Sequence, residues 1–222
     1  MGQSPINILV WYEGRHSEDV YPLRIHGTLA GTLREQPDMQ VWIAELDNWE
    51  QGITEATLAA MDVLVWWGHK RHAEVSDETV QRITERVREG MGFLPIHSSH
   101  YSRPFGALMG TECGVGDWRE EGEPEHLTTL LPEHPIAQGL PAEWDIPETE
   151  MYAEPFAVPE PEEVVFHSRW DRGEEFRSGC TWTRGEGRIF YWRPGHESYR
   201  IFDQPHFQRV LVNGVRWCAR RT

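Results

Sequence analysis

Histidines follow most of the apolar, strand-like runs of this sequence. They come after INILVWYE, after DVLVWWG, after MGFLPI and after RIFYWRP. Because the carboxyl ends of neighbouring parallel strands meet at one edge of a sheet, these side chains are expected to share one rim. Neutral imidazoles with a nearby carboxylate are the ligands expected for Zn, Mn, Fe or Ni. Six of the eleven histidines occupy such positions: His16, His69, His72, His97, His100 and His196.

A divalent metal site is therefore predicted, with His97 and His196 as ligands. The carboxylate comes from the segment ETEMYAEPF, in which Glu150 and Glu154 are four residues apart. That spacing places both on one side of a helix and also on one side of a strand, so either could complete the set. We expect Glu150 as the third ligand. No nucleotide cofactor is expected, because no glycine-rich phosphate loop is present.

A metal ion that polarises a carbonyl needs nearby side chains to move protons. Glutamate and histidine at the same rim can do this, and Glu197 directly follows a predicted ligand. The candidates for this catalytic role are His69, His100, Glu154 and Glu197.

Ser98 offers a rival, nucleophilic chemistry. A serine after a strand, with His196 and Glu197 elsewhere, could form a hydrolase triad. The surrounding residues are I-H-S-S-H, however, and lack the glycines that make a strained nucleophile turn easy to form. A serine hydrolase is kept as the alternative.

The elements that must position these residues alternate between strand and helix. Four strand-like runs are separated by helical segments, which predicts right-handed crossovers and a mainly parallel sheet flanked by helices. Ser76 and Thr54 are expected helix caps. The predicted helices span about 17–36, 54–61, 76–89 and 204–219, and strands are predicted near 6–13, 39–46, 62–68, 91–96, 163–170, 178–184 and 188–194.

Residues 114–163 interrupt this alternation with Pro- and Glu-rich sequence. The stretch contains short segments such as EHPIAQGLPAEW and little apolar periodicity. It is too short to build its own core, so it is predicted to be an irregular excursion within a single domain of residues 1–222.

Composition excludes several classes of protein. The 21 basic residues against 36 acidic ones give a net charge of −15, which argues against binding nucleic acid or anionic membranes. The N-terminal sequence lacks a signal-peptide pattern, so a cytoplasmic location is expected. Three cysteines without a CxxC pair indicate reduced, buried thiols.

Several separated motifs together resemble the trehalose-utilisation family, the ThuA-like proteins. They are LVWWGHKRHAEV, GMGFLPIHSSHYSRPFGALMGTEC, ETEMYAEPF, FRSGCTWTRGEGRIFYWRPGHESY and NGVRWCA. They occur in the family's order over nearly the whole chain. Departures from the usual pattern are Tyr12, Ser99 and Ala153, of which Tyr12 places an aromatic ring where an amide is common.

The resemblance implies a flavodoxin-like three-layer α/β sandwich related to the class I glutamine amidotransferases. In those enzymes a catalytic cysteine stands on the turn after a strand. Here His97 occupies that place, while His196 and Glu197 match a late His-x-Glu-like element. No cysteine stands in the turn, so thiolate glutaminase chemistry is not expected.

The resemblance also implies a role in the breakdown of trehalose or related disaccharides, alongside an oxidoreductase that makes 3-keto sugars. The expected substrate is a small sugar, and a homo-oligomer is compatible with the family. A non-catalytic sugar-binding or partner protein is the other reading. Sugar-binding candidates are Ser98, Tyr101, Tyr152 and Arg193, and further aromatic residues that could stack on a pyranose ring are Trp66, Trp67 and Tyr199.

Overall fold

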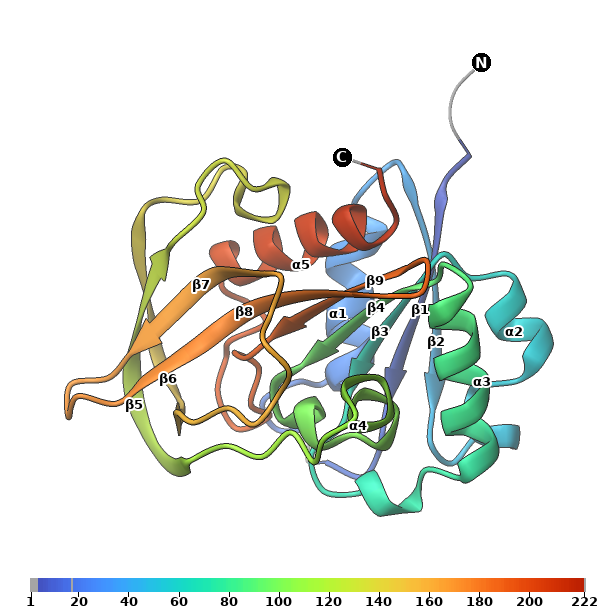
Figure 1. Cartoon of the computed structure of the whole chain (residues 1–222), viewed down its shortest axis with the longest axis horizontal. Helices are drawn as coiled ribbons and strands as arrows, with labels where there is room; N and C mark the ends of the chain where they lie inside the picture. The colour runs from blue at the N-terminus through green and yellow to red at the C-terminus, as the bar shows by residue number, and fades with distance from the viewer. Residues whose placement is uncertain (1–3, 17, 222) are drawn as a thin grey trace.

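The computed structural model describes residues 4–16 and 18–221, and a large sheet runs through its centre (Figure 1). In this part of the chain the strand order is β2-β1-β3-β4-β9-β8-β7-β5-β6. The strands are β1 (Ile6–Tyr12), β2 (Met39–Glu45), β3 (Val63–Trp67), β4 (Gly92–Ile96), β5 (Asp117–Thr129), β6 (Glu143–Ala153), β7 (Glu163–Arg169), β8 (Glu175–Arg184) and β9 (Gly187–Trp192).

The sheet is mixed, which corrects the prediction of a mainly parallel one. Strands β2, β1, β3, β4 and β9 pair in parallel. From β9 onward, β8, β7, β5 and β6 pair antiparallel. The parallel half results from helical crossovers, whereas the short turn RGEG between β8 and β9 permits only an antiparallel return.

Helices cover both faces of the parallel half. On one face α1 (Arg24–Arg34) and α5 (Pro205–Cys218) pack in one apolar core, and on the other α2 (Glu55–Ala59), α3 (Asp77–Arg88) and α4 (Arg103–Met109) pack in a second. Figure 1 shows these two helical layers on either side of the strands. This is an α/β fold with helices on both faces of a large mixed sheet.

Local sequence signals set several helix ends. The Ser76 hydroxyl accepts a hydrogen bond from the Thr79 N–H at 3.2 Å, and Thr54 caps α2 in the same way, so both predicted caps are confirmed. The predicted start of the first helix, Ser17, lies outside the described residues. Helix α1 begins at Arg24, after Pro22, because a proline inside a helix lacks the N–H and clashes with the preceding turn. Helix α4 was not predicted.

The segment 114–163 is not irregular, since it contains the long strands β5 and β6. They form an antiparallel hairpin whose register shifts between Arg119 and Glu123 and again before Glu125. Such bulges bend a strand pair. The sequence signal was weak because β5 carries charged residues on an exposed face, among them Arg119, which pairs with Glu123.

A buried ion pair joins this hairpin to the rest of the sheet. Arg193, just after β9, pairs with Glu125 of β5, and both side chains are fully buried. The Arg193 guanidinium also donates to the backbone carbonyl of Glu150 on β6 at 2.6 Å. Ser168 of β7 donates a further hydrogen bond to Glu125. The Arg193 guanidinium thereby connects β5 and β6 with the end of β9, and Glu125 extends the link to β7.

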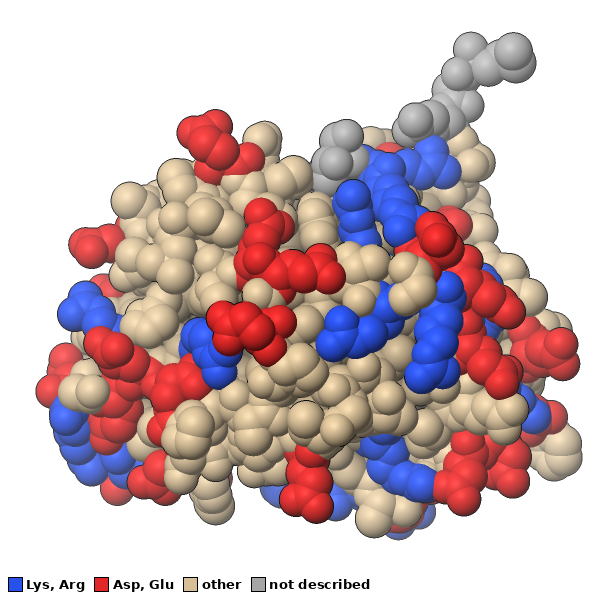
Figure 2. All heavy atoms as spheres, in the orientation of Figure 1, with Lys and Arg blue, Asp and Glu red and all other residues tan. Residues whose placement is uncertain are grey.

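The cysteines and the last helix agree with the sequence. All three cysteines are buried free thiols. The predicted apolar face of α5, including Phe207 and Leu211, is buried. Among the described residues no helix has both the length and the hydropathy needed to cross a bilayer. On the face shown in Figure 2, basic side chains lie among acidic ones.

Replacing Arg193 should destabilise the fold strongly. Arg193→Met leaves Glu125 buried without its partner, and we expect the free energy of unfolding to fall by about 3–5 kcal/mol. Urea denaturation followed by tryptophan fluorescence measures this. The double variant Glu125→Leu/Arg193→Met should be more stable than Arg193→Met. A double variant as unstable as the single one would contradict a role for the ion pair.

Candidate metal centre

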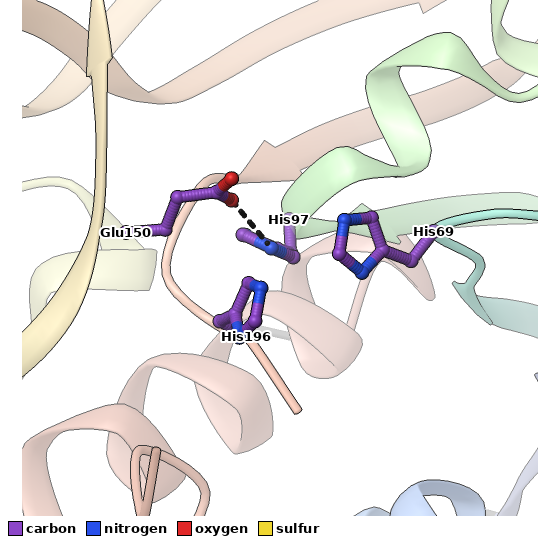
Figure 3. Close-up of side chains that lie close together, drawn as sticks. All are labelled: His69, His97, Glu150 and His196. Carbon is purple, nitrogen blue, oxygen red and sulfur yellow. Dashed lines mark ion pairs between the residues drawn. The ribbon is translucent and has the colours of Figure 1, made fainter. Parts of the chain in front are cut away.

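Four side chains converge at the carboxyl ends of the parallel strands. His69 follows β3, His97 follows β4 and His196 follows β9, while Glu150 comes from β6 (Figure 3). One possible ligand atom from each lies within 4.8 Å of those from the others. The structure thus brings together all three predicted ligands and His69, which the sequence assigned to proton transfer.

His97 stands on a sharp turn between β4 and a short 3-10 helix (His97–Tyr101). Its φ of 59° lies in the left-handed region, where a non-glycine residue is strained. The turn is packed closely: a Cβ on Gly195 would come within 2.8 Å of the Ile96 side chain. The turn after β4, where the related amidotransferases carry their cysteine, therefore forms without flanking glycines and presents the imidazole of His97.

Hydrogen bonds fix the protonation of the His97 ring. Its Nδ1 lies 3.2 Å from the carbonyl oxygen of Arg193, and a carbonyl only accepts, so Nδ1 carries the proton. Burial holds the pKa of His97 well below its usual value, which keeps the ring neutral. The lone pair is then on Nε2, which lies 3.1 Å from Glu150 Oε2. Neither of these two buried atoms has a hydrogen-bond partner.

The Glu150 carboxylate is nearly as buried as His97. Its side chain is 3% exposed, and this burial raises the pKa of its carboxyl group. The Arg193 guanidinium fixes the backbone of Glu150 by donating a hydrogen bond to its carbonyl oxygen. The strand end of β9 therefore fixes both His97 and Glu150.

His69 is held by Glu197. Its Nδ1 lies 2.7 Å from one Glu197 carboxylate oxygen and 2.9 Å from the other. Burial opposes ionisation of Glu197, but hydrogen bonds from His16 and His69 outweigh it and lower its pKa, so the carboxylate accepts the Nδ1 proton. A carboxylate behind an imidazole is the usual outer support of a metal-binding histidine.

Glu197 forms ion pairs with His16 and Lys70. The Lys70 ammonium donates to the Glu197 carboxylate at 3.0 Å. His16 lies between two carboxylates, with Nε2 2.7 Å from Glu13 and Nδ1 3.2 Å from Glu197. The backbone N–H groups of Lys70 and Arg71 donate to Glu13, which fixes the loop that carries His69. The sequence placed His16 at this rim but gave it no role.

His196 makes a different hydrogen bond. The backbone N–H of Ser198 donates to its Nδ1 at 3.1 Å, and its Nε2 is buried without a partner. The carboxylates of Glu120 and Glu197 are 3.6 and 3.7 Å from Nε2. Burial lowers the pKa of His196 to about 4, so the ring is neutral.

A cavity of about 240 Å³ opens beside His69 and Glu150. Two exposed aromatic rings line this cavity, Tyr101 with 47% and Trp118 with 59% of its surface exposed. Trp118 and Glu120 belong to the charged segment of β5, whose strand the sequence did not reveal, so they were not predicted. The other lining residues are Ser98, Val115 and Tyr152.

Three of the predicted site residues have other roles. Arg193 is fully buried in its ion pair, so it positions the site and is not available to a sugar. The Glu154 carboxylate pairs with Arg177 at 2.8 Å instead of joining the histidines. His100 donates from Nδ1 to the Cys113 carbonyl at 2.7 Å and is not part of the four-residue group.

The nucleophilic alternative gains no support from the geometry of Ser98. Its hydroxyl donates to the Gly68 carbonyl at 3.1 Å, and no histidine among the described residues is hydrogen-bonded to it. Ser99 forms a similar link, accepting from the Gly68 N–H at 2.9 Å. These serines tie the His97 turn to the His69 loop.

The aromatic candidates differ in how close they come to the cavity and the histidines. Trp66 and Trp67 are fully buried, and Trp66 stacks on Trp11 at a centroid distance of 3.5 Å, so neither reaches a sugar. Tyr152 lines the cavity and stacks on His97 at 5.4 Å. The Tyr199 ring lies 5.3 Å from that of His196.

The other two departures from the family pattern, besides Ser99, also make identifiable contacts. The Tyr12 hydroxyl accepts from the His16 N–H at 3.1 Å, so the aromatic ring supports the His16 loop. Ala153 borders a separate surface hollow with Glu154 and Arg177.

Residues 7–218 match the family of trehalose-utilisation proteins, ThuA. The chain belongs to the ThuA family. The resemblance seen in the sequence motifs is therefore confirmed. No curated protein sequence matches the chain.

Several solved structures share its fold, and two of them are of putative ThuA-like proteins. A putative ThuA-like protein from Bacteroides uniformis is 16% identical, with a TM-score of 0.75 over 98% of this chain and 93% of that one. One from Parabacteroides merdae is 18% identical, with a TM-score of 0.73 over 98% and 90%. A cytoplasmic protein from Salmonella typhimurium is 16% identical, with a TM-score of 0.66 over 96% and 99%.

The protonation of His16 should be visible in the pH dependence of stability. Burial alone would lower its pKa, but the hydrogen bonds to Glu13 and Glu197 outweigh it and raise the pKa from 6.5 to about 9. Protonated His16 thus stabilises the fold fully below pH 6.5, and this contribution is lost as the pH rises through 9.

The difference in unfolding free energy between wild type and His16→Gln should fall across that window by roughly 2 kcal/mol. Urea titrations at several pH values measure it, with His206→Gln, which changes an exposed histidine of α5, as control. If the difference in unfolding free energy between wild type and His16→Gln stays constant from pH 6.5 to pH 9, His16 is not charged in the folded protein.

Proposed function

We propose that this protein is a metal-dependent enzyme acting on a keto-sugar derived from trehalose or another disaccharide. The main support for this proposal is a pair of acceptor atoms, His97 Nε2 and Glu150 Oε2. They lie 3.1 Å apart, buried and without hydrogen-bond partners. A lone pair and a carboxylate oxygen repel each other at this distance unless a positive charge lies near both.

A divalent cation satisfies this site better than a proton. A proton between His97 and Glu150 would serve only those two atoms. The Nε2 lone pair of His69 would gain nothing from it. A cation bound among the side chains of the group serves all of these acceptors, and the bond from His69 to Glu197 supplies the outer support that such ligands need.

The donor types favour a borderline metal. Imidazole nitrogens suit Zn, Fe, Ni and Mn, and one carboxylate adds the charge that holds a divalent ion. Thiolate ligands, which would favour a purely structural zinc, are absent from the four-residue group.

The chemistry follows from a cation next to an open cavity. A bound metal polarises a carbonyl oxygen and makes the neighbouring carbon more acidic, which supports isomerisation, hydration or bond cleavage beside the carbonyl. An oxidoreductase that makes 3-keto sugars would supply such a carbonyl. Glu197, whose carboxylate accepts the Nδ1 proton of His69, is the group beside these ligands that would move a proton.

The cavity supports a sugar as the substrate. Its volume of about 240 Å³ is below the usual range for drug-sized ligands, so it suits a small molecule. Tyr101 and Trp118 offer exposed rings for the apolar face of a pyranose. A disaccharide would place one ring near the cation and the other against these aromatic residues.

Metal analysis tests the proposal. Protein purified without a histidine tag should contain about one equivalent of a divalent metal, and His97→Ala should lose it. His126→Ala, a surface histidine that pairs with Asp145, should retain it. The absence of bound metal in the wild type after incubation with Zn, Mn, Fe and Ni would refute the metal role. A change in the mass or the NMR spectrum of 3-keto-trehalose that is absent with His97→Ala would establish catalysis, whereas tight binding of a sugar that stays unchanged by both measures would indicate a binding protein.

Sugar binding should depend on Trp118. Trp118→Ala should weaken binding of the disaccharide about 2- to 10-fold, since a stacked aromatic ring contributes about 0.5–1.5 kcal/mol beyond its buried area. Calorimetric titration measures the affinity. Trp49 is 82% exposed and outside the cavity, so Trp49→Ala is the matched control. Equal losses in both variants would argue against stacking at Trp118.

A further inference from the structure

The histidines of the cluster do not all present the same kind of nitrogen to its centre. In His69 and His97, Nδ1 faces an acceptor, namely the Glu197 carboxylate and the Arg193 carbonyl. Each Nδ1 therefore carries a proton, and in the neutral form of each ring Nε2 carries the lone pair. These two rings are ready to bind a cation through Nε2.

His196 has the opposite arrangement. Its Nδ1 accepts from the Ser198 N–H, so in the neutral ring Nδ1 holds the lone pair and Nε2 carries the proton. This N–H is buried without a hydrogen-bond partner. The carboxylates of Glu120 and Glu197, at 3.6 and 3.7 Å, are beyond hydrogen-bond distance. A buried donor without a partner is costly, so its place in the fold indicates a ligand that accepts from it.

We propose a division of labour in which His69, His97 and Glu150 hold the cation, and His196 donates a hydrogen bond from Nε2 to the substrate oxygen. This inference rests on the proposed function and changes the role that the sequence assigned to His196. Two histidines and one carboxylate can bind a metal on one side and leave positions open on the other. His196 is close to those ligands, with its ring 5.0 Å from that of His69 and 5.2 Å from that of His97.

The arrangement suits a reaction in which negative charge develops on a carbonyl oxygen. The cation would stabilise that charge from one direction and the His196 N–H from another. A fixed donor in a site without bulk water needs no reorganisation when the charge forms. If His196 were a ligand through Nε2 instead, its ring would have to move the proton to Nδ1 and lose the bond from Ser198.

Metal affinity separates the two roles. Metal-depleted protein is titrated with Co²⁺, and the affinity, stoichiometry and visible absorption spectrum are recorded for wild type and variants. His69→Ala and His97→Ala should lower the affinity more than about 100-fold, because removing even an outer-shell partner costs about 10- to 100-fold. His196→Ala should change it less than about 10-fold and leave a similar Co²⁺ spectrum. His196→Gln, whose amide can replace the Nε2–H, should bind the keto-sugar more tightly than His196→Ala.

The outcomes distinguish failure of this inference from failure of the proposed function. If wild type binds no Co²⁺, the metal role itself is refuted. If wild type binds Co²⁺ and His196→Ala loses it as His97→Ala does, His196 is a ligand and the division of labour is wrong. Should His196→Ala fail to fold, nitrogen NMR of the wild type with Zn²⁺ bound decides the question. A proton on His196 Nε2 supports the inference, and a metal-bound Nε2 overturns it.

Discussion

The buried guanidinium of Arg193 connects the parts of this molecule on which the candidate site depends. Its side chain pairs with Glu125 and donates to the Glu150 carbonyl, while its own backbone carbonyl accepts the Nδ1 proton of His97. Arg193 therefore attaches the β5–β6 hairpin to the sheet. It also positions Glu150, the only carboxylate of the four-residue group, and sets the tautomer of His97. A charge buried this deeply is tolerated only because its partners are fixed around it.

Burial gives the cluster its chemical character. Desolvation keeps His97 and His196 neutral at ordinary pH, so their nitrogens present lone pairs or N–H groups instead of positive charges. The same desolvation raises the pKa of Glu150. Behind the cluster, His16 shows the opposite shift. It lies between the carboxylates of Glu13 and Glu197, which raise its pKa to about 9. The neutral rings of His97 and His196 thus lie at the centre of the cluster, with charged groups behind them.

The sequence was informative where a local pattern has one structural solution. Apolar runs separated by capped helices specified the parallel strands, and the histidines after those strands met at one rim as expected. It failed where the structure depends on distant partners. The strand β5 has a charged exposed face, so its pairing could not be read from apolar periodicity, and with it Trp118 and Glu120 were missed. Arg193 looked like a binding residue because its partner, Glu125, is 68 residues away in the chain.

By itself, the sequence determined the α/β class, the ThuA motifs and the rim on which His69, His97 and His196 gather. These follow from local periodicity and from the rule that parallel strands end at one edge. Only the tertiary structure decided that Glu150 and not Glu154 joins them, because the bends in the β5–β6 hairpin and the pairing of Glu154 with Arg177 are long-range facts. It also decided which nitrogen of each histidine carries the proton. That depends on whether a carbonyl, a carboxylate or an N–H stands behind the ring, and residue type and spacing do not encode this.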